Sequence, residues 1–209
     1  MVPPAAAASA ELLRTMAHEL RQPLSTIESI AYYLALVLPP DDEKIQHLDR
    51  IQRLVEQSNW IVTSAQQLAE PVRLSLQPLR IERLVEEILA ERSTPGDAPE
   101  TEIQPGLPAV SLDPAMARAL LINLLMLFRC IARPGCPARL ALRGDGAVTL
   151  ELATDADGYK SEASLGPGAA LGLESARRMV AAQGGSLDLR IDPGQGVRLR
   201  VTFAAAVVP

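Results

Sequence analysis

The sequence is poor in cysteine and in aromatic residues. It has two cysteines among 209 residues, Cys130 and Cys136, which is too few for a disulfide framework or a four-ligand zinc site. This scarcity is typical of proteins from a reducing compartment. Aromatic residues make up only 3% of the chain, whereas hydrophobic residues make up 48%. The core must therefore come from Leu, Ala, Val and Ile, which favour packed helices over an aromatic-rich barrel.

The sequence also lacks an excess of basic residues. It has 20 Lys and Arg against 25 Asp and Glu, a formal net charge of -5. A nucleic-acid binder normally presents a basic face, so we expect no nucleic-acid partner. There is no uninterrupted run of about 18 apolar residues, and residues 1–13 lack the basic start of a signal peptide. We therefore expect a cytoplasmic protein without a membrane span.

Proline is scarce in the first third of the chain. Pro23 is the only proline between Ala5 and Leu38, and residues 41–70 contain none. Apolar residues recur there with helical spacing, at Leu13, Met16, Leu20, Leu24, Ile27 and Leu34, and at Ile45, Leu48, Ile51, Val55, Val62, Ala65 and Leu68. This pattern predicts two amphipathic helices forming an antiparallel hairpin. A lone hairpin buries such a stripe poorly, so we expect a homodimer with a four-helix bundle.

The rest of the chain mixes helices with alternating strands. The patterns predict helices over 79–92, 113–131 and 171–183, a loop over 93–106 with a short strand at 101–103, and hairpins around 144–146 and 193–196. The fold class is therefore α+β: a helical hairpin followed by an α/β sandwich, one sheet under one helical layer. The predicted divisions are a tail at 1–8, the hairpin at 9–70, a linker at 71–78 and a second domain at 79–209.

The densest chemical signal surrounds His18. On a helix, Arg14, Arg21, Gln22 and Ser25 share its polar face. A solvated histidine beside a carboxylate is a plausible phosphoryl acceptor, because neutral imidazole attacks phosphorus. A bare histidine on a wet helix face is more often an ordinary polar residue, so spacing alone leaves both interpretations open. His47, between two apolar residues of the second helix, is better explained as a surface or packing residue.

The segment MAHELRQPLSTI, residues 16–27, resembles the H-box of sensor histidine kinases. The match rests on His18 followed by Glu19, with Pro-Leu at +5 and +6, at the opening helix of a hairpin. LDPAMARALLINLL resembles the N-box helix, GAALGL resembles the G2-box, and ARRMVAAQGGSLDLR with GQGVRLRVTF resembles the closing helix and hairpin. The resemblance covers nearly the whole chain.

The resemblance implies roles for four residues of the first helix. His18 would be the nucleophile and phosphoryl carrier, and Glu19 would orient the ring. Arg21 would neutralise charge on the incoming phosphoryl group. Gln22 stands where the family often has Thr or Asn and would support dephosphorylation of a partner. A receiver domain would dock below His18, around Ser25, Ile27, Glu28 and residues 31–33.

The N-box departs from the family pattern at the metal ligand. Asn123 holds its first position, but Leu127-Phe128 stand where the family has Asn-Ala, whose Asn reaches Mg²⁺ on ATP. A leucine cannot ligate a hard cation that needs oxygen ligands.

The adenine-binding box departs as well. Strand alternation places Thr154 at the adenine-binding Asp of the family, Ala156 at its first Gly and Gly158 at its second. A one-residue bulge would instead bring Asp155 into that position, and the sequence leaves this alternative open.

The lid is short and the last glycine box is incomplete. Only nine residues separate Gly158 from Gly168, and the family's ATP lid is missing from them. Gly168 and Gly172 are kept, but Ala170 stands where a Gly usually lets the backbone approach phosphate. We therefore interpret Asn123, Asp155, Gly158, Gly168 and Gly172 as remnants of a degenerate nucleotide site.

These features predict a phosphorelay histidine phosphotransferase. His18 would exchange a phosphoryl group with the Asp of response-regulator receiver domains, downstream of a hybrid or sensor kinase. We expect no resident cofactor and no sensor module ahead of the H-box; Mg²⁺ would come with the receiver. The first alternative is an ATP-dependent sensor-type histidine kinase that autophosphorylates on His18 with ATP and Mg²⁺. The second is a non-catalytic pseudokinase scaffold.

Overall fold

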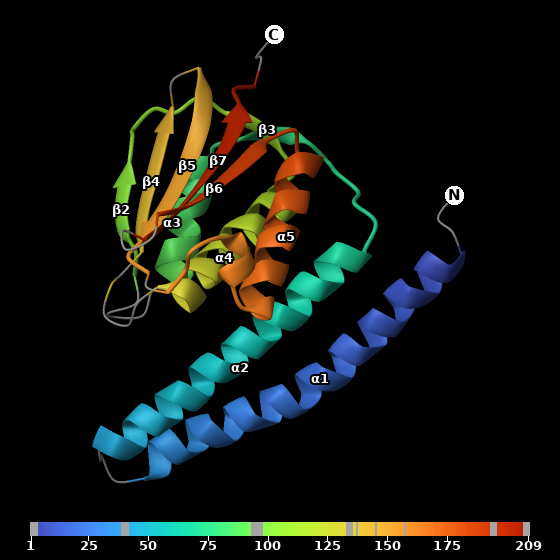
Figure 1. The fold of residues 1–209 in the computed structure, drawn as a ribbon, viewed down its shortest axis with the longest axis vertical. Helices are drawn as coiled ribbons and strands as arrows, with labels where there is room; N and C mark the ends of the chain where they lie inside the picture. The colour runs from blue at the N-terminus through green and yellow to red at the C-terminus, as the bar shows by residue number, and fades with distance from the viewer. Residues whose placement is uncertain are drawn as a thin grey trace. The chain divides into compact units, whose positions relative to one another are not determined.

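The computed structural model describes residues 4–38, 42–92, 98–132, 136, 138–144, 146–156, 158–192 and 196–206. The chain divides into two compact units, Met1–Pro71 and Val72–Pro209. Figure 1 shows a pair of long helices in the first unit and a helix-backed sheet in the second. The predicted fold class is therefore confirmed.

The first unit is a hairpin of two helices. α1 spans Pro4–Val37 and α2 spans Asp42–Ala69. α1 begins inside the stretch 1–8 that was predicted as a tail. It also runs unbroken through Pro23. The most buried described side chains of α1 are Ala17 and Ala31, which share one face because they lie about four turns apart.

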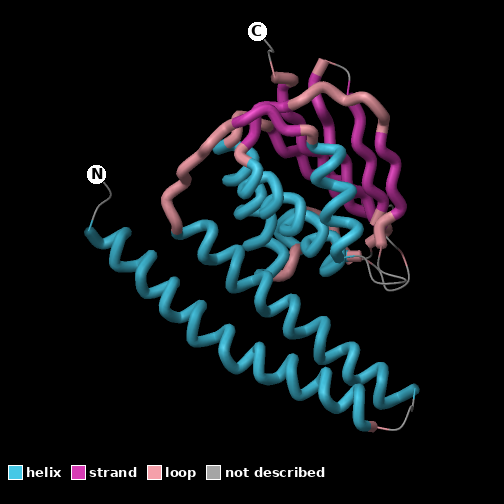
Figure 2. The backbone as a smooth tube through the Cα atoms, turned by 180° about the vertical axis from the view of Figure 1, so that it is seen from behind, coloured by secondary structure: helices cyan, strands magenta, loops and turns pink. Residues whose placement is uncertain are grey.

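The second unit is a five-stranded sheet with helices on one face. Its elements are β1 (Gln77–Leu79), α3 (Ile81–Arg92), β2 (Glu100–Ile103), β3 (Val110–Leu112), α4 (Pro114–Ile131), β4 (Arg139–Gly144), β5 (Ala147–Thr154), the short 3₁₀ helix η1 (Glu162–Ser164), α5 (Pro167–Ala182), β6 (Ser186–Asp192) and β7 (Gly196–Ala204). The strand order in the sheet is β2-β4-β5-β7-β6. Figures 1 and 2 show α3, α4 and α5 together against one side of it.

Alternation along the central strands decides which side is the core. Val148, Leu150 and Leu152 of β5 are buried, and so are the alternate residues of β7, while Thr149 and Glu151 lie on the other face. Pairs such as Leu150 with Val201 lie directly opposite each other in the antiparallel ladder. The core is thus the aliphatic layer between sheet and helices, as the composition predicts.

Short strands account for the main differences from the sequence predictions. Leu79 belongs to β1, which pairs with β3, so α3 begins at Ile81. β1 and β3 have three residues each, too few to show alternation. β2 pairs with β4 in parallel, whereas only antiparallel strands were expected.

The apolar helix α4 is the core helix of the second unit. Its mean hydropathy of 1.6 over 18 residues is high enough, by length and composition, to cross a membrane. No other helix among the described residues meets this criterion. Eight of its residues are buried, including Leu120, Leu124 and Phe128. Packing in a protein core therefore accounts for its apolar composition.

Candidate functional site

His18 lies in the middle of α1, and its side chain is exposed. Its ring nitrogen Nε2 lies 3.3 Å from Nε2 of Gln22, one turn along the helix. When Nε2 of the imidazole carries no proton it accepts this hydrogen bond. The i, i+4 spacing noted in the sequence already placed Gln22 beside His18, whereas the sequence interpretation gave the orienting role to Glu19. The role of Glu19, which is also exposed, stays a prediction.

Pro23 modifies the backbone next to His18. Because proline has no N–H, the carbonyl of Glu19 loses its usual helical donor. The polar side chains that follow bond within the helix: Thr26 donates to the carbonyl of Gln22 at 3.0 Å. The face around His18 therefore presents an imidazole ring and the side-chain amide of Gln22 within one turn.

Arg21 is directed toward the second helix. Its guanidinium donates to Oγ1 of Thr63 at 3.1 Å and to Oε1 of Gln66 at 2.6 Å, and it is half-buried. Sequence spacing alone gave no sign of these two partners, because they are more than 40 residues away. In this arrangement Arg21 ties α1 to α2, and its predicted role at the phosphoryl group stays a prediction.

The predicted receiver-docking surface is mostly exposed. Ser25, Glu28, Tyr32 and Tyr33 all reach solvent, with Tyr33 62% exposed. Ala31 is the exception, because it is only 2% exposed and faces inward. Ala31 was predicted to be part of the docking surface, but in the structure it is buried and does not belong to that surface.

In the second unit, Asn123 is a structural residue of the core. It is 3% exposed, and its Nδ2 donates to the carbonyl of Gly172 at 2.9 Å, joining α4 to α5. One turn further, Leu127 is 1% exposed and Phe128 is fully buried. The two positions where the family has Asn-Ala are thus filled by core side chains.

The end of β5 shows where Thr154 and Asp155 lie. The antiparallel ladder continues without a bulge to the pair Thr154–Val197, and Thr154 is 2% exposed on the core side. Asp155 lies on the surface, where its carboxylate is 3.4 Å from the guanidinium of Arg139. The ladder has no bulge between Ala147 and Thr154, and the alternative in which Asp155 takes the adenine position stays a prediction.

The glycine positions lie partly inside a helix. α5 begins at Pro167, four residues earlier than predicted, so Gly168 and Gly172 are both helical. The earlier start is explained by Pro167 at the first helical position, which a helix accepts readily. Gly158, in contrast, is exposed and has φ +84°. Ala156, two residues before Gly158, is 6% exposed.

The segment that precedes α5 is held by an ion pair. Both guanidinium nitrogens of Arg177 on α5 reach the carboxylate of Glu162 in η1, at 2.5 and 2.6 Å. Hydrogen bonding from Arg177 lowers the pKa of Glu162, and the same contact raises the pKa of Arg177. Sequence analysis missed this pair, since the two residues are 15 apart and belong to different elements.

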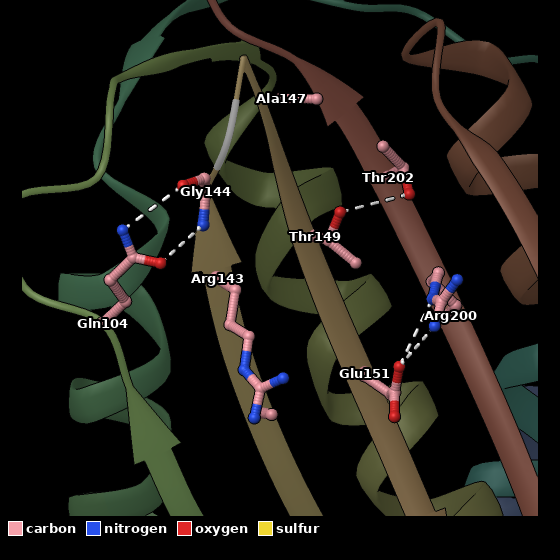
Figure 3. A pocket seen from close by; sticks show the side chains of 9 residues that line it. Gln104, Arg143, Gly144, Ala147, Thr149, Glu151, Arg200 and Thr202 are labelled. Atoms are coloured by element: carbon pink, nitrogen blue, oxygen red, sulfur yellow. Dashed lines mark hydrogen bonds and ion pairs between the residues drawn. The ribbon is translucent and has the colours of Figure 1, made fainter.

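A cavity of about 470 Å³ lies on the open face of the sheet. Figure 3 shows its lining from β4, β5 and β7, with Gln104 bonded to the backbone of Gly144 and Glu151 paired with Arg200. These side chains alternate with the core-facing ones, so the cavity lies on the face away from α4 and α5. It is therefore separate from the remnants of the nucleotide site.

The residues present do not fit ATP with Mg²⁺. Leu127 provides no oxygen ligand at the metal position, and the amide of Asn123 donates to Gly172. Thr154, which the sequence analysis placed at the adenine carboxylate, has no charge, and the carboxylate of Asp155 lies near the guanidinium of Arg139. Within the described residues, no group of three or more His, Cys, Asp or Glu side chains is placed to hold a metal ion.

No family model matches the chain. The sensor histidine kinase ZraS of Klebsiella oxytoca is 30% identical over 200 residues, which cover 87% of this chain and 43% of the relative. ZraS of Escherichia coli K12 is 24% identical over 196 residues, covering 87% of this chain and 42% of the relative. The chain thus spans less than half the length of the curated relatives it matches.

Solved structures share the fold. Full-length ShkA in complex with AMPPNP has a TM-score of 0.62 at 24% identity, covering 95% of this chain and 47% of ShkA. The Acinetobacter baumannii histidine kinase AdeS has a TM-score of 0.53 at 19% identity, covering 90% of this chain and 98% of the matched AdeS chain. The fold is that of a histidine kinase core.

The chain is therefore similar in sequence to the sensor histidine kinases over most of its own length. It shares the fold of a histidine kinase core, a helical hairpin followed by a sheet backed by helices.

Proposed function

We propose that this chain carries a phosphoryl group on His18 and exchanges it with the receiver Asp of response regulators. The observation that carries the proposal is the place of His18: exposed, on the first helix of a kinase-core hairpin, with Gln22 at its Nε2. The histidine is accessible to a partner, and its neighbours on the helix are polar.

The phosphoryl transfer can be written with every bond and proton accounted for. A lone pair on the neutral imidazole attacks phosphorus, the N–P bond forms and the acyl P–O bond of an aspartyl phosphate breaks. The released carboxylate keeps the electron pair, and the proton on the other ring nitrogen leaves the ring. Glu19, in its predicted role, would accept or hold that proton. Mg²⁺ would be supplied by the receiver.

The relatives support the kinase alternative better than the phosphotransferase. Each is named a sensor histidine kinase, and the ShkA structure contains AMPPNP, so ATP is the donor that relatedness favours. The buried Leu127 and Thr154 favour a receiver as donor instead. Both proposals make His18 the acceptor, and both assume a homodimer that works with response regulators.

The chain provides its own control for testing His18. It has two histidines, and His47 is also exposed on a helix of the same hairpin. With phosphoramidate as an inorganic phosphoryl donor, we expect acid-labile, base-stable label on wild type and on His47→Ala, and its loss in His18→Ala. Equal labelling of the two histidines would contradict a special role for His18.

The second step tests transfer. Labelled wild-type protein, freed of the donor, is mixed with a panel of receiver domains and Mg²⁺. We expect the label to move to the Asp of at least one receiver. Label that stays on His18 across the panel would favour the scaffold.

A further inference from the structure

We infer that residues 158–166 form a closed latch, fastened by Glu162 and Arg177, in place of a nucleotide lid. The chain then takes no Mg²⁺–ATP, and the phosphoryl group on His18 comes from an aspartyl phosphate. The identity of the donor rests on the proposed function, whereas the latch and the loss of ATP binding do not.

Four backbone N–H groups of the latch form hydrogen bonds within it. The hydroxyl of Ser164 accepts from the N–H groups of Lys160 and Ser161, at 3.0 and 3.3 Å. The N–H of Ser164 donates to the carbonyl of Ser161 and that of Leu165 to the carbonyl of Glu162, both at 3.0 Å. Phosphate-binding loops need backbone N–H groups that point at the ligand, and these four are already engaged.

The start of α5 offers less to an anion than an ordinary helix start. Pro167 occupies the first helical position and has no N–H to donate. Leu165 just ahead of it is 8% exposed, which anchors the end of the latch in the core. The segment therefore enters the helix through a buried leucine and a proline.

The ion pair fastens the latch to α5 further along. Two parallel N–H···O contacts join Arg177 to Glu162, which is the geometry that makes an arginine–carboxylate pair strong. Arg177 also lies 3.9 Å from Glu174 on its own helix. The ion pair thus holds the latch against α5. The latch begins at Gly158, near the predicted adenine position, and ends just before the glycines of α5.

Nucleotide binding is tested by calorimetry on the full chain with Mg²⁺ and AMPPNP. We expect no saturable binding up to about 1 mM, the upper end of usual substrate KM values. Saturable binding below that concentration would overturn the inference. Phosphoramidate labelling of His18 involves no nucleotide, so failure of that labelling and failure of this inference are distinguishable.

The latch itself is tested by hydrogen exchange. In Glu162→Ala we expect the amides of Ser164 and Leu165 to exchange at least tenfold faster than in wild type. Glu174→Ala is the matched control, since it removes a carboxylate from the same arginine without touching the latch, and exchange there should stay unchanged. Equal exchange rates in wild type and Glu162→Ala would show that the ion pair does not stabilise the latch.

Discussion

Asp113 forms hydrogen bonds with three different segments of the second unit. Its Oδ1 accepts from the N–H of Met116 at 2.9 Å and caps α4, while its Oδ2 accepts from the N–H of Ser75 at 2.8 Å. Its own N–H donates to Oε1 of Gln183 at 3.0 Å. The backbone hydrogen bond from Met116, followed by that from Ser75, lowers the pKa of this carboxyl group.

Asp113→Ala should lower the free energy of unfolding by about 1–2 kcal/mol, the usual effect of losing a helix cap. Asp113→Asn keeps a capping oxygen and should lose less. Because the folded pKa lies below the unfolded value of about 3.9, the carboxylate stabilises the fold above that pH. This contribution is lost as the pH falls through the lowered folded pKa. Urea unfolding across pH would contradict this if wild type and Asp113→Asn lost stability equally on acidification.

Two glycines with positive φ differ in their surroundings. At Gly196, φ is +122°, and an added Cβ would overlap the carbonyl oxygen of Thr154; at Gly146, φ is +69° and the space is open. Gly146→Ala should therefore cost only about 1 kcal/mol of left-handed strain. Gly196→Ala should cost about 3 kcal/mol or more, since the backbone must also move. Thermal unfolding of both variants measures the difference, and equal losses would contradict the close approach.

Among the elements, sequence periodicity predicted the long helices and the two hairpins well. α1, α2 and α4 each repeat apolar residues over many turns, and Asp113 followed by proline marks the start of α4. The pairing of β1 with β3 and the parallel edge strand β2 depend on contacts between distant segments. The same limit applies at the site: His18 was found from a local motif, whereas the partners of Arg21 and Glu162 were not predictable from spacing.

A double-mutant cycle can test the hydrogen bond between Arg21 of α1 and Gln66 of α2. Arg21→Ala and Gln66→Ala should each destabilise the hairpin, with a coupling of about 0.5–1.5 kcal/mol, the ordinary net value of a hydrogen bond. Urea unfolding of the single and double variants gives the coupling. Additive losses would contradict the tie. A rate of His18 labelling that falls in Arg21→Ala alone would instead support the predicted role at the phosphoryl group.

At the scale of the whole molecule, the exposed apolar residues of the hairpin indicate where two chains would pair. On α1 they lie at helical spacing on one side, at Leu12, Met16, Leu20, Ile27 and Ile30, each at least 44% exposed. His18 lies on a different side of the same helix. A patch of this kind usually marks an interface. A second copy that covers it would leave His18 accessible, which is what phosphoryl exchange with a receiver requires.

Leu20→Glu places a charge in the centre of this exposed stripe. If two chains pair through it, burying an unpaired carboxylate is costly, so the variant should be monomeric at concentrations where wild type is a dimer. Light scattering after size exclusion would show a mass falling from twice 22.4 kDa to 22.4 kDa. Val72→Glu, at a residue 38% exposed outside the hairpin, should leave the dimer intact. A dimer that survives Leu20→Glu would mean that the subunits pair through another surface.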